Sequence, residues 1–200
     1  MGSFQYHLLS TCGQTDSNWV ETASAVHKVV DNFHIREKTA AARDLLLYVD
    51  ELLHRGVPAS KLVINDRIDV ALARGLAVQL AYHSLPIQDV KKTWPDIRTG
   101  VSVHSVDEAR EAADGGADYV FFGHVFQTGS KPGLEPKGIS ALEQVVNHCP
   151  IPVIAIGGIK PHHVPLIQQA GAAGVAVLSG VMGAADPQAA IQAYKEEELT

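Results

Sequence analysis

Short apolar runs alternate with longer stretches of mixed polarity along most of this chain. The apolar runs are rich in valine, isoleucine, leucine and aromatic residues, which is typical of β-strands. Several are almost continuously apolar, as parallel strands covered on both faces are. On this basis we expect eight strands, over residues 4–10, 32–37, 61–65, 77–81, 99–103, 118–123, 151–156 and 174–179.

The stretches between these runs are predicted to form helices. Residues 37–56 carry a stripe of leucine and valine and end at Gly56, a common helix terminator. Residues 105–116 begin at Ser105 and carry Glu108 three positions later, which is the capping-box pattern. Two further helices, each with a proline near its start, are predicted over residues 160–171 and 186–198.

Strands that alternate with helices, without a linker rich in proline or serine, predict a single domain over residues 1–200. Its fold class is α/β, and the expected architecture is a single (β/α)8 TIM barrel. A doubly wound open sheet is the alternative, because it would use the same strands in a row.

Composition narrows the expected partners. Apolar residues make up 46% and charged residues 19% of the 200 residues, as in a globular protein with a sizeable core. The net charge is −6 and there is no basic tract, so neither nucleic acid nor a membrane surface is an expected partner. No apolar run is long enough to span a bilayer, and the first residues lack a secretion signal. Cys12 and Cys149 lie far apart, so we expect two reduced thiols and a cytoplasmic location.

Polar residues follow the predicted strands at their carboxyl ends, where the active site of a TIM barrel lies. The opposite ends of the strands are less polar, and this asymmetry is typical of an enzyme, although loops are commonly polar. The candidate substrate-binding residues at these positions are Arg36, Lys38, Asn65, Ser102, Thr128, Lys131, Gly157, Gly158, Ser179 and Gly180.

A phosphate subsite is predicted after the last two strands. Gly157 and Gly158 follow one of these strands, and Ser179 and Gly180 follow the other. Glycine lets backbone N–H groups approach an anion, and a helix that starts there adds a favourable positive end. The alternative is that these glycines only form tight turns.

The sequence "HIREK" predicts a second charged subsite. Strand alternation places His34, Arg36 and Lys38 on one face of their strand. Two cations at a barrel mouth are costly unless an anion meets them, so we expect contact with an anionic ligand. A structural ion pair with Glu37 or Asp66 is the alternative.

Four histidines, His34, His83, His104 and His124, lie at predicted strand ends. Their spacing matches no common zinc motif, so neither a metal nor another cofactor is expected. One imidazole that takes and returns a proton near neutral pH is the favoured interpretation, and His124 is the candidate, because it stands where a buried strand opens into a polar loop.

Six blocks give the chain a family resemblance over about residues 4–185. They are "HIREK", "VINDR", "GVSVHS", "ADYVFFGHVFQTGSK", "IPVIAIGGI" and "GVAVLSGV". In this order and spacing the chain resembles the thiamin phosphate synthase superfamily. The resemblance implies a (β/α)8 barrel and a phosphate subsite at Gly157, Gly158 and the Ser179 loop.

Three departures distinguish the chain from the synthases, which couple a pyrimidine pyrophosphate to a thiazole phosphate with magnesium. The synthases carry glutamine at the position of His34, where its amide binds the pyrimidine. Ser84 stands where their second metal-binding acid belongs, so Asp66 alone would be a poor magnesium site. Their G-P-x-F motif is replaced by glycine, His124, valine and phenylalanine.

The substitution at His124 resembles the thiazole tautomerase branch of the superfamily. The resemblance implies an isomerase of thiamin biosynthesis in which His124 shuttles a proton and aromatises a thiazole carboxylate phosphate. Lys38 or Arg36, with Ser102, would meet the carboxylate, and the glycine loops would hold the phosphate. The alternatives are a magnesium-dependent thiamin phosphate synthase and a non-catalytic regulatory protein that binds thiazole phosphate. A homo-oligomer is expected by analogy with the family.

Overall fold

The computed structural model describes residues 3–10, 18–130 and 133–199, and in this part of the chain eight parallel strands form a closed barrel. Each strand pairs with the next, and the last pairs with the first through the register of Tyr6 with Val175. The barrel confirms the predicted (β/α)8 fold, and the open-sheet alternative is wrong. The strands are β1 (Gln5–Leu9), β2 (Asn32–Ile35), β3 (Leu62–Asn65), β4 (Ala77–Leu80), β5 (Thr99–Val103), β6 (Tyr119–Gly123), β7 (Val153–Ile156) and β8 (Gly174–Val177).

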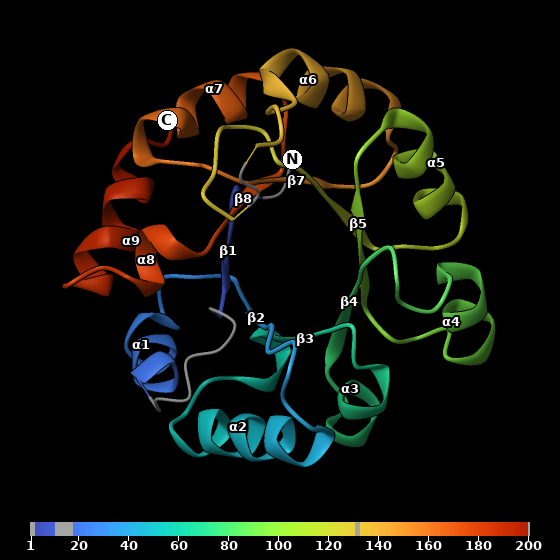
Figure 1. Ribbon diagram of the computed structural model, residues 1–200, viewed down its shortest axis with the longest axis vertical. Helices are drawn as coiled ribbons and strands as arrows, with labels where there is room; N and C mark the ends of the chain where they lie inside the picture. Colours follow the sequence, from blue (N-terminus) through green and yellow to red (C-terminus); the bar gives the residue numbers. More distant parts are fainter. Residues whose placement is uncertain (1–2, 11–17, 131–132, 200) are drawn as a thin grey trace.

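The helices form a ring outside the strands (Figure 1). Two short 3-10 turns, η1 (Ala59–Lys61) and η2 (Pro161–His163), precede β3 and the seventh helix. The α-helices are α1 (Asn18–Val26), α2 (Ala42–His54), α3 (Ile68–Arg74), α4 (Ile87–Thr93), α5 (Val106–Asp114), α6 (Gly138–His148), α7 (Val164–Gln169), α8 (Ser179–Met182) and α9 (Pro187–Glu196). Among the described residues, no helix combines the length and apolar character that crossing a bilayer requires.

Two predicted helices begin later than the sequence pattern suggested. Helix α2 starts at Ala42, and residues 37–41 form a loop that carries polar side chains across the barrel mouth. The predicted helix over residues 160–171 divides into η2 and α7. The expected cap of α5 is confirmed, since Ser105 Oγ accepts a hydrogen bond from the Glu108 amide. The Glu108 carboxylate accepts a hydrogen bond from the amide of His104, one residue earlier than a capping box requires.

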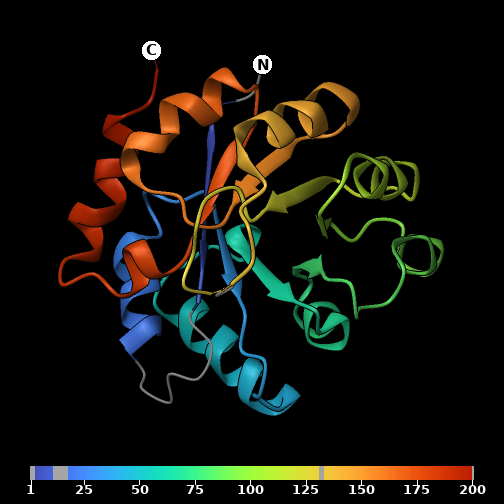
Figure 2. The ribbon, with the colours of Figure 1, turned by 45° about the horizontal axis from the view of Figure 1, so that its top comes forward.

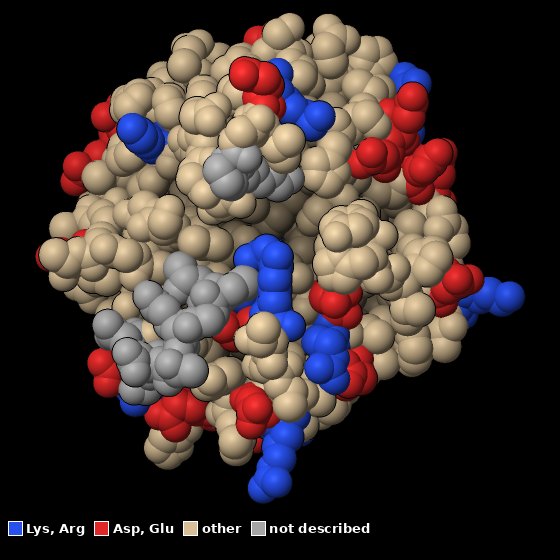
Figure 3. Space-filling view, viewed as in Figure 1, with Lys and Arg blue, Asp and Glu red and all other residues tan. Residues whose placement is uncertain are grey.

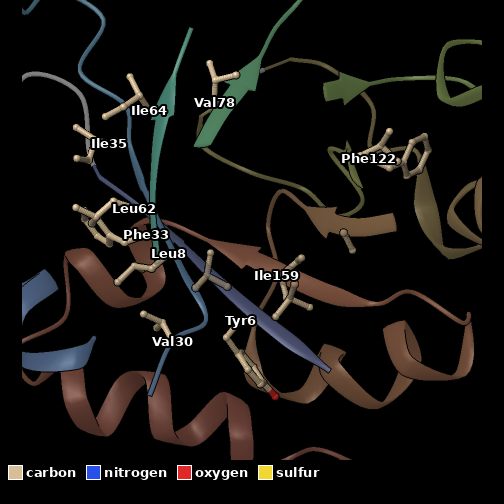
Figure 4. Close-up of a cluster of buried hydrophobic side chains, with 14 of the residues drawn as sticks. Tyr6, Leu8, Val30, Phe33, Ile35, Leu62, Ile64, Val78, Phe122 and Ile159 are labelled. Atoms are coloured by element: carbon tan, nitrogen blue, oxygen red, sulfur yellow. The ribbon is translucent and has the colours of Figure 1, made fainter. Parts of the chain in front are cut away.

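The barrel wall separates two packed regions. Outward-facing side chains such as Leu8, Phe33 and Ile64 pack against the helices and form the larger core, shown in Figure 4. The smaller region lies inside the barrel, where strand alternation brings Tyr119, Phe121 and other apolar residues together. Buried polar side chains share this interior, so the floor beneath the carboxyl ends of the strands is only partly apolar.

Candidate active site

A pocket of about 760 Å³ opens at the carboxyl ends of the strands. Figure 3 shows this face hollowed at its centre, with lysine and arginine side chains at the edge of the hollow. Lys131 lies outside the described residues. The other predicted site residues all line this single pocket, namely Arg36, Lys38, Asn65, Ser102, His124, Thr128, Gly157, Gly158, Ser179 and Gly180.

The glycines after β7 allow two loops to touch. Gly157 and Gly158 adopt positive φ angles of 99° and 67°, which favour glycine. A Cβ atom at Gly157 would lie 2.3 Å from Cβ of His124, and one at Gly158 would lie 2.2 Å from the carbonyl oxygen of Gln127. These glycines therefore let the β6–α6 loop pack directly on the β7 loop, so the tight-turn alternative and the phosphate prediction are compatible.

The helix starts expected at the phosphate subsite are mostly missing. After Gly158 the chain continues as a loop to η2, and α7 begins only at Val164. Helix α8 does begin at Ser179, but it has only four residues. An anion here would therefore be met by loop N–H groups and the Ser179 hydroxyl rather than by a long helix dipole.

Arg36 and Lys38 lie in the loop that follows β2. The Arg36 amide donates to Ser10 Oγ at 2.8 Å, and Ser10 Oγ in turn donates to a Glu37 carboxylate oxygen at 2.8 Å. Ser10 is fully buried, so this pair of bonds fixes the loop to the end of β1. Both cationic side chains line the pocket beside Glu37.

His34 does not share the pocket with Arg36 and Lys38, contrary to the alternation argument. Strand β2 ends at Ile35, and the fully buried His34 points into the barrel interior. Its Nε2 atom lies 2.8 Å from Nδ1 of His7, a buried residue on β1 that sequence reasoning missed. The alternating pattern of β1 could have revealed His7, because it places Gln5, His7 and Leu9 on one face.

The buried histidine pair is neutral. Burial lowers the pKa of His34 to about 3, with a further contribution from the positive charge of Arg98. Burial, His34 and Arg98 together lower the pKa of His7 well below its ordinary value. Since the two rings share one short contact, one nitrogen donates and the other accepts.

His124 directly follows β6, and it is 7% exposed. Its Nε2 atom lies 3.3 Å from the carbonyl oxygen of Leu134, across the β6–α6 loop. A carbonyl can only accept, so Nε2 carries the hydrogen and donates to Leu134. Figures 1 and 2 show this loop, in yellow, turned toward the barrel mouth, and Thr128 and Ser130 of the loop line the pocket. The hydrogen bond from His124 Nε2 to Leu134 thus holds the β6–α6 loop in place.

The loops after β3 and β4 meet at Asp66. Its φ angle is 68°, and it is the only non-glycine residue with positive φ in the part of the chain that the structure describes. One carboxylate oxygen, Oδ1, accepts from Ser84 Oγ at 2.5 Å, and the other lies 3.2 Å from His83 Nε2. Strained backbone of this kind is commonly retained at functional sites.

The donor atoms around Asp66 do not fit the two-carboxylate magnesium site that the family resemblance implies. Ser84 occupies the second position as a neutral hydroxyl whose hydrogen is given to Asp66. Magnesium prefers oxygen ligands, whereas the neighbouring His83 offers a nitrogen. Among the described residues, no group of three or more carboxylate, histidine or cysteine side chains could hold a metal ion.

Comparison with known proteins identifies relatives over most of the chain. The family model described as thiamine monophosphate synthase matches residues 8–181. A thiamine-phosphate synthase from Chlorobium phaeovibrioides is 41% identical over 167 residues, which cover 82% of this chain and 80% of that protein. One from Roseiflexus sp. is 40% identical over 166 residues, covering 80% of this chain and 69% of that protein. The structure of thiamine phosphate pyrophosphorylase from Pyrococcus furiosus superposes with a TM-score of 0.83 at 32% identity, covering 97% and 95% of the two chains.

These findings overturn the expected isomerase. Relatives that are 36–41% identical to the chain are named thiamine-phosphate synthase and not thiazole tautomerase. Thiamine-phosphate synthases are transferases. The tautomerase expectation is therefore wrong, and the proton-shuttle role of His124 falls with it. The synthase alternative agrees better with the relatives. The misleading feature was the histidine after β6, whose Nε2 atom contacts the backbone of its own loop.

Proposed function

Since this chain belongs to the thiamine monophosphate synthase family, we propose that it joins a pyrimidine pyrophosphate to a thiazole phosphate and forms thiamine phosphate. The observation that carries the proposal is one pocket with two different regions whose side chains and backbone suit an anion. Arg36 and Lys38 line it from the β2 loop, and the glycine loops after β7 and β8 line it as well. A reaction between two phosphorylated substrates requires such a pair of regions.

The coupling makes modest demands on the protein. The lone pair of the thiazole nitrogen attacks the methylene carbon of the pyrimidine, and the carbon–oxygen bond to pyrophosphate breaks. Pyrophosphate leaves with the electron pair, and the thiazole becomes a thiazolium cation, so no proton has to move. The site must orient the two rings and stabilise the charge that develops on the leaving group.

The pocket residues divide between these tasks. Gly157, Gly158 and the Ser179–Gly180 loop hold the thiazole phosphate, while Arg36 and Lys38 meet the pyrophosphate. Asn65 on β3 and Ser102 on β5, the strands on either side of β4, also line the pocket and offer hydrogen bonds to the rings. Gln79 donates to Ser102 Oγ at 3.1 Å and fixes its position.

His124 acts in this proposal as a positioning residue. Its hydrogen bond to the Leu134 carbonyl closes the β6–α6 loop, which carries Thr128 to the pocket. Thr128 is then available to the thiazole phosphate.

The proposal is tested with purified protein, thiazole phosphate and pyrimidine pyrophosphate, with thiamine phosphate measured by mass spectrometry. We expect one thiamine phosphate for each pyrophosphate released. Arg36→Ala and Lys38→Ala should each lower kcat by about 10²-fold, as the loss of one transition-state donor does. A protein that binds thiazole phosphate but forms no product, with or without magnesium, would instead be the non-catalytic binding protein.

A further inference from the structure

The loops after β3 and β4 meet through contacts among Asp66, His83 and Ser84 at the pocket edge. Ser84 Oγ accepts from the Ala81 amide at 2.8 Å, and it donates to Asp66 Oδ1. His83 Nε2 lies 3.2 Å from Asp66 Oδ2. Both oxygens of this carboxylate are therefore engaged by protein groups.

Few negative groups surround the pocket. The carboxylates that line it, in the described part of the chain, are Glu37 and Asp66. Glu37 accepts a hydrogen bond from Ser10, which follows β1, and Asp66 accepts one from Ser84, which follows β4. A magnesium ion that stands between a protein and a pyrophosphate is held by one or two carboxylates. Here both oxygens of Asp66 already contact protein groups, and a hydroxyl stands at the position of the second acid.

Positive groups lie within the same pocket. Arg36 and Lys38 line it from the β2 loop, and Arg67 lines it next to Asp66. Arg67 is bound to Asp69 through Nε and Nη2, so it is held in the β3 loop rather than directed freely at a ligand. Arg36 and Lys38 lie on the β2 side of this pocket, and an arginine side chain can bind phosphate oxygens through two N–H groups.

From this arrangement we infer that the chain binds pyrophosphate with its own side chains, without a magnesium ion held by two carboxylates. The inference rests on the proposed function for the identity of the ligand. Ser84 is the residue that decides it, because its hydroxyl contacts Asp66 at the position of the missing acid. Asp66 serves to connect the loops after β3 and β4, and its positive φ angle is held by that connection.

The inference predicts that one substitution creates metal dependence. Ser84→Asp would place a second carboxylate beside Asp66, and the repulsion between them would be relieved by a divalent cation. Ser84→Asn is the matched control, since asparagine has the same shape without the charge.

The experiment is isothermal titration calorimetry of each protein with inorganic pyrophosphate, once with a chelator and once with magnesium. For the wild type we expect binding in chelator, and equal or weaker binding in magnesium, because free magnesium competes for the ligand. Ser84→Asp should bind weakly in chelator and at least about 10-fold more tightly in magnesium, whereas Ser84→Asn should show no such gain.

Other results would overturn the inference in distinguishable ways. Magnesium that strengthens wild-type binding 10-fold or more would show a metal site and leave the synthase proposal standing. Binding in neither condition would remove the pyrophosphate subsite and the proposed function together. Pyrophosphate binding without product formation would contradict only the proposed function.

Asp66→Asn provides a second measurement if Ser84→Asp does not fold. Loss of this carboxylate should leave wild-type pyrophosphate affinity in magnesium unchanged or slightly higher, because a negative charge has been removed from the pocket. A drop of 10-fold or more in magnesium alone would mean that Asp66 holds a metal ion.

Discussion

At the scale of single residues, substitutions of His124 distinguish a positioning role from a proton-transfer role. His124→Ala removes the hydrogen bond to the Leu134 carbonyl, and a bond of this kind contributes about 0.5–1.5 kcal/mol. We therefore expect KM for the thiazole phosphate to rise about 2- to 10-fold while kcat changes less than about 3-fold. Steady-state kinetics with both substrates would measure this.

His124→Gln is the matched variant, because its side-chain amide retains an N–H donor without a titrating ring. Partial recovery of KM would support the loop contact. A fall in kcat of about 10² or more in both variants would contradict it, since that is the size expected for a lost acid–base catalyst.

Most of the pocket residues could be predicted from sequence because their positions depend only on where a strand ends. Asn65, Gly157 and Ser179 follow this rule and reach the pocket. His34 does not, because β2 ends one residue after it and alternation could not be carried on to Arg36. A local sequence pattern also could not show that His7, 27 residues away in the chain, would face His34 in the barrel.

At the scale of elements, the contact between the β6 and β7 loops predicts unequal effects for two glycines. Gly158→Ala would place a methyl group 2.2 Å from the carbonyl oxygen of Gln127, which is backbone and cannot turn away. Gly133→Ala is the control, because its φ angle is also positive, 77°, but nothing lies within 4 Å. We expect about 1–2 kcal/mol of destabilisation from φ alone at Gly133, and about 1–3 kcal/mol more at Gly158.

Chemical denaturation measures the two free energies of unfolding, and KM for the thiazole phosphate measures the displacement of the loop. Gly158→Ala should raise KM at least about 10-fold, while Gly133→Ala should leave it nearly unchanged. Equal effects on stability and KM would mean that the glycines serve only the backbone turn.

The elements themselves were well predicted where apolar periodicity determines them. All eight strands of the described chain overlap their predicted ranges. The errors lie at helix starts, where residues 37–41 form a loop and Pro161–His163 form the 3-10 turn η2 in place of α-helix. Tertiary contacts replace local preference at both places: Glu37 accepts a hydrogen bond from Ser10, and Phe126 stacks on His163 with ring centroids 3.7 Å apart.

At the scale of the whole molecule, the alternation of strands and helices predicted a parallel sheet with both faces covered by helices, and the closure of that sheet into a barrel is seen in the structure. The polar content of the barrel interior was not visible in that pattern. His34 Nδ1, Gln79 Oε1 and Tyr119 Oη are buried there without a protein partner among the described residues. Such groups cost free energy unless water reaches them, so the interior stabilises this fold less than an apolar one would.

The buried His7–His34 pair makes the whole barrel sensitive to acid. Both imidazoles are held neutral, since burial lowers the pKa of His34 to about 3 and that of His7 well below its ordinary value. In the unfolded chain these rings take up protons once the pH falls below about 6.5, whereas the folded pair does not. The two histidines therefore leave the free energy of unfolding unchanged above pH 6.5 and lower it as the pH falls from there toward 3. The loss is at most about 1.4 kcal/mol per pH unit for each histidine.

Urea denaturation at pH 7, 6, 5 and 4 tests this expectation against other acid-sensitive groups. His34→Gln replaces the buried imidazole with a neutral amide, so the decrease in unfolding free energy from pH 6 to pH 4 should be smaller than in the wild type by about 1–3 kcal/mol. His148→Gln alters an exposed histidine at the end of α6 and should leave the decrease unchanged. If the two variants lost stability in parallel with the wild type, the buried pair would not be the acid-sensitive element, and protonation of the surface carboxylates would account for the whole decrease.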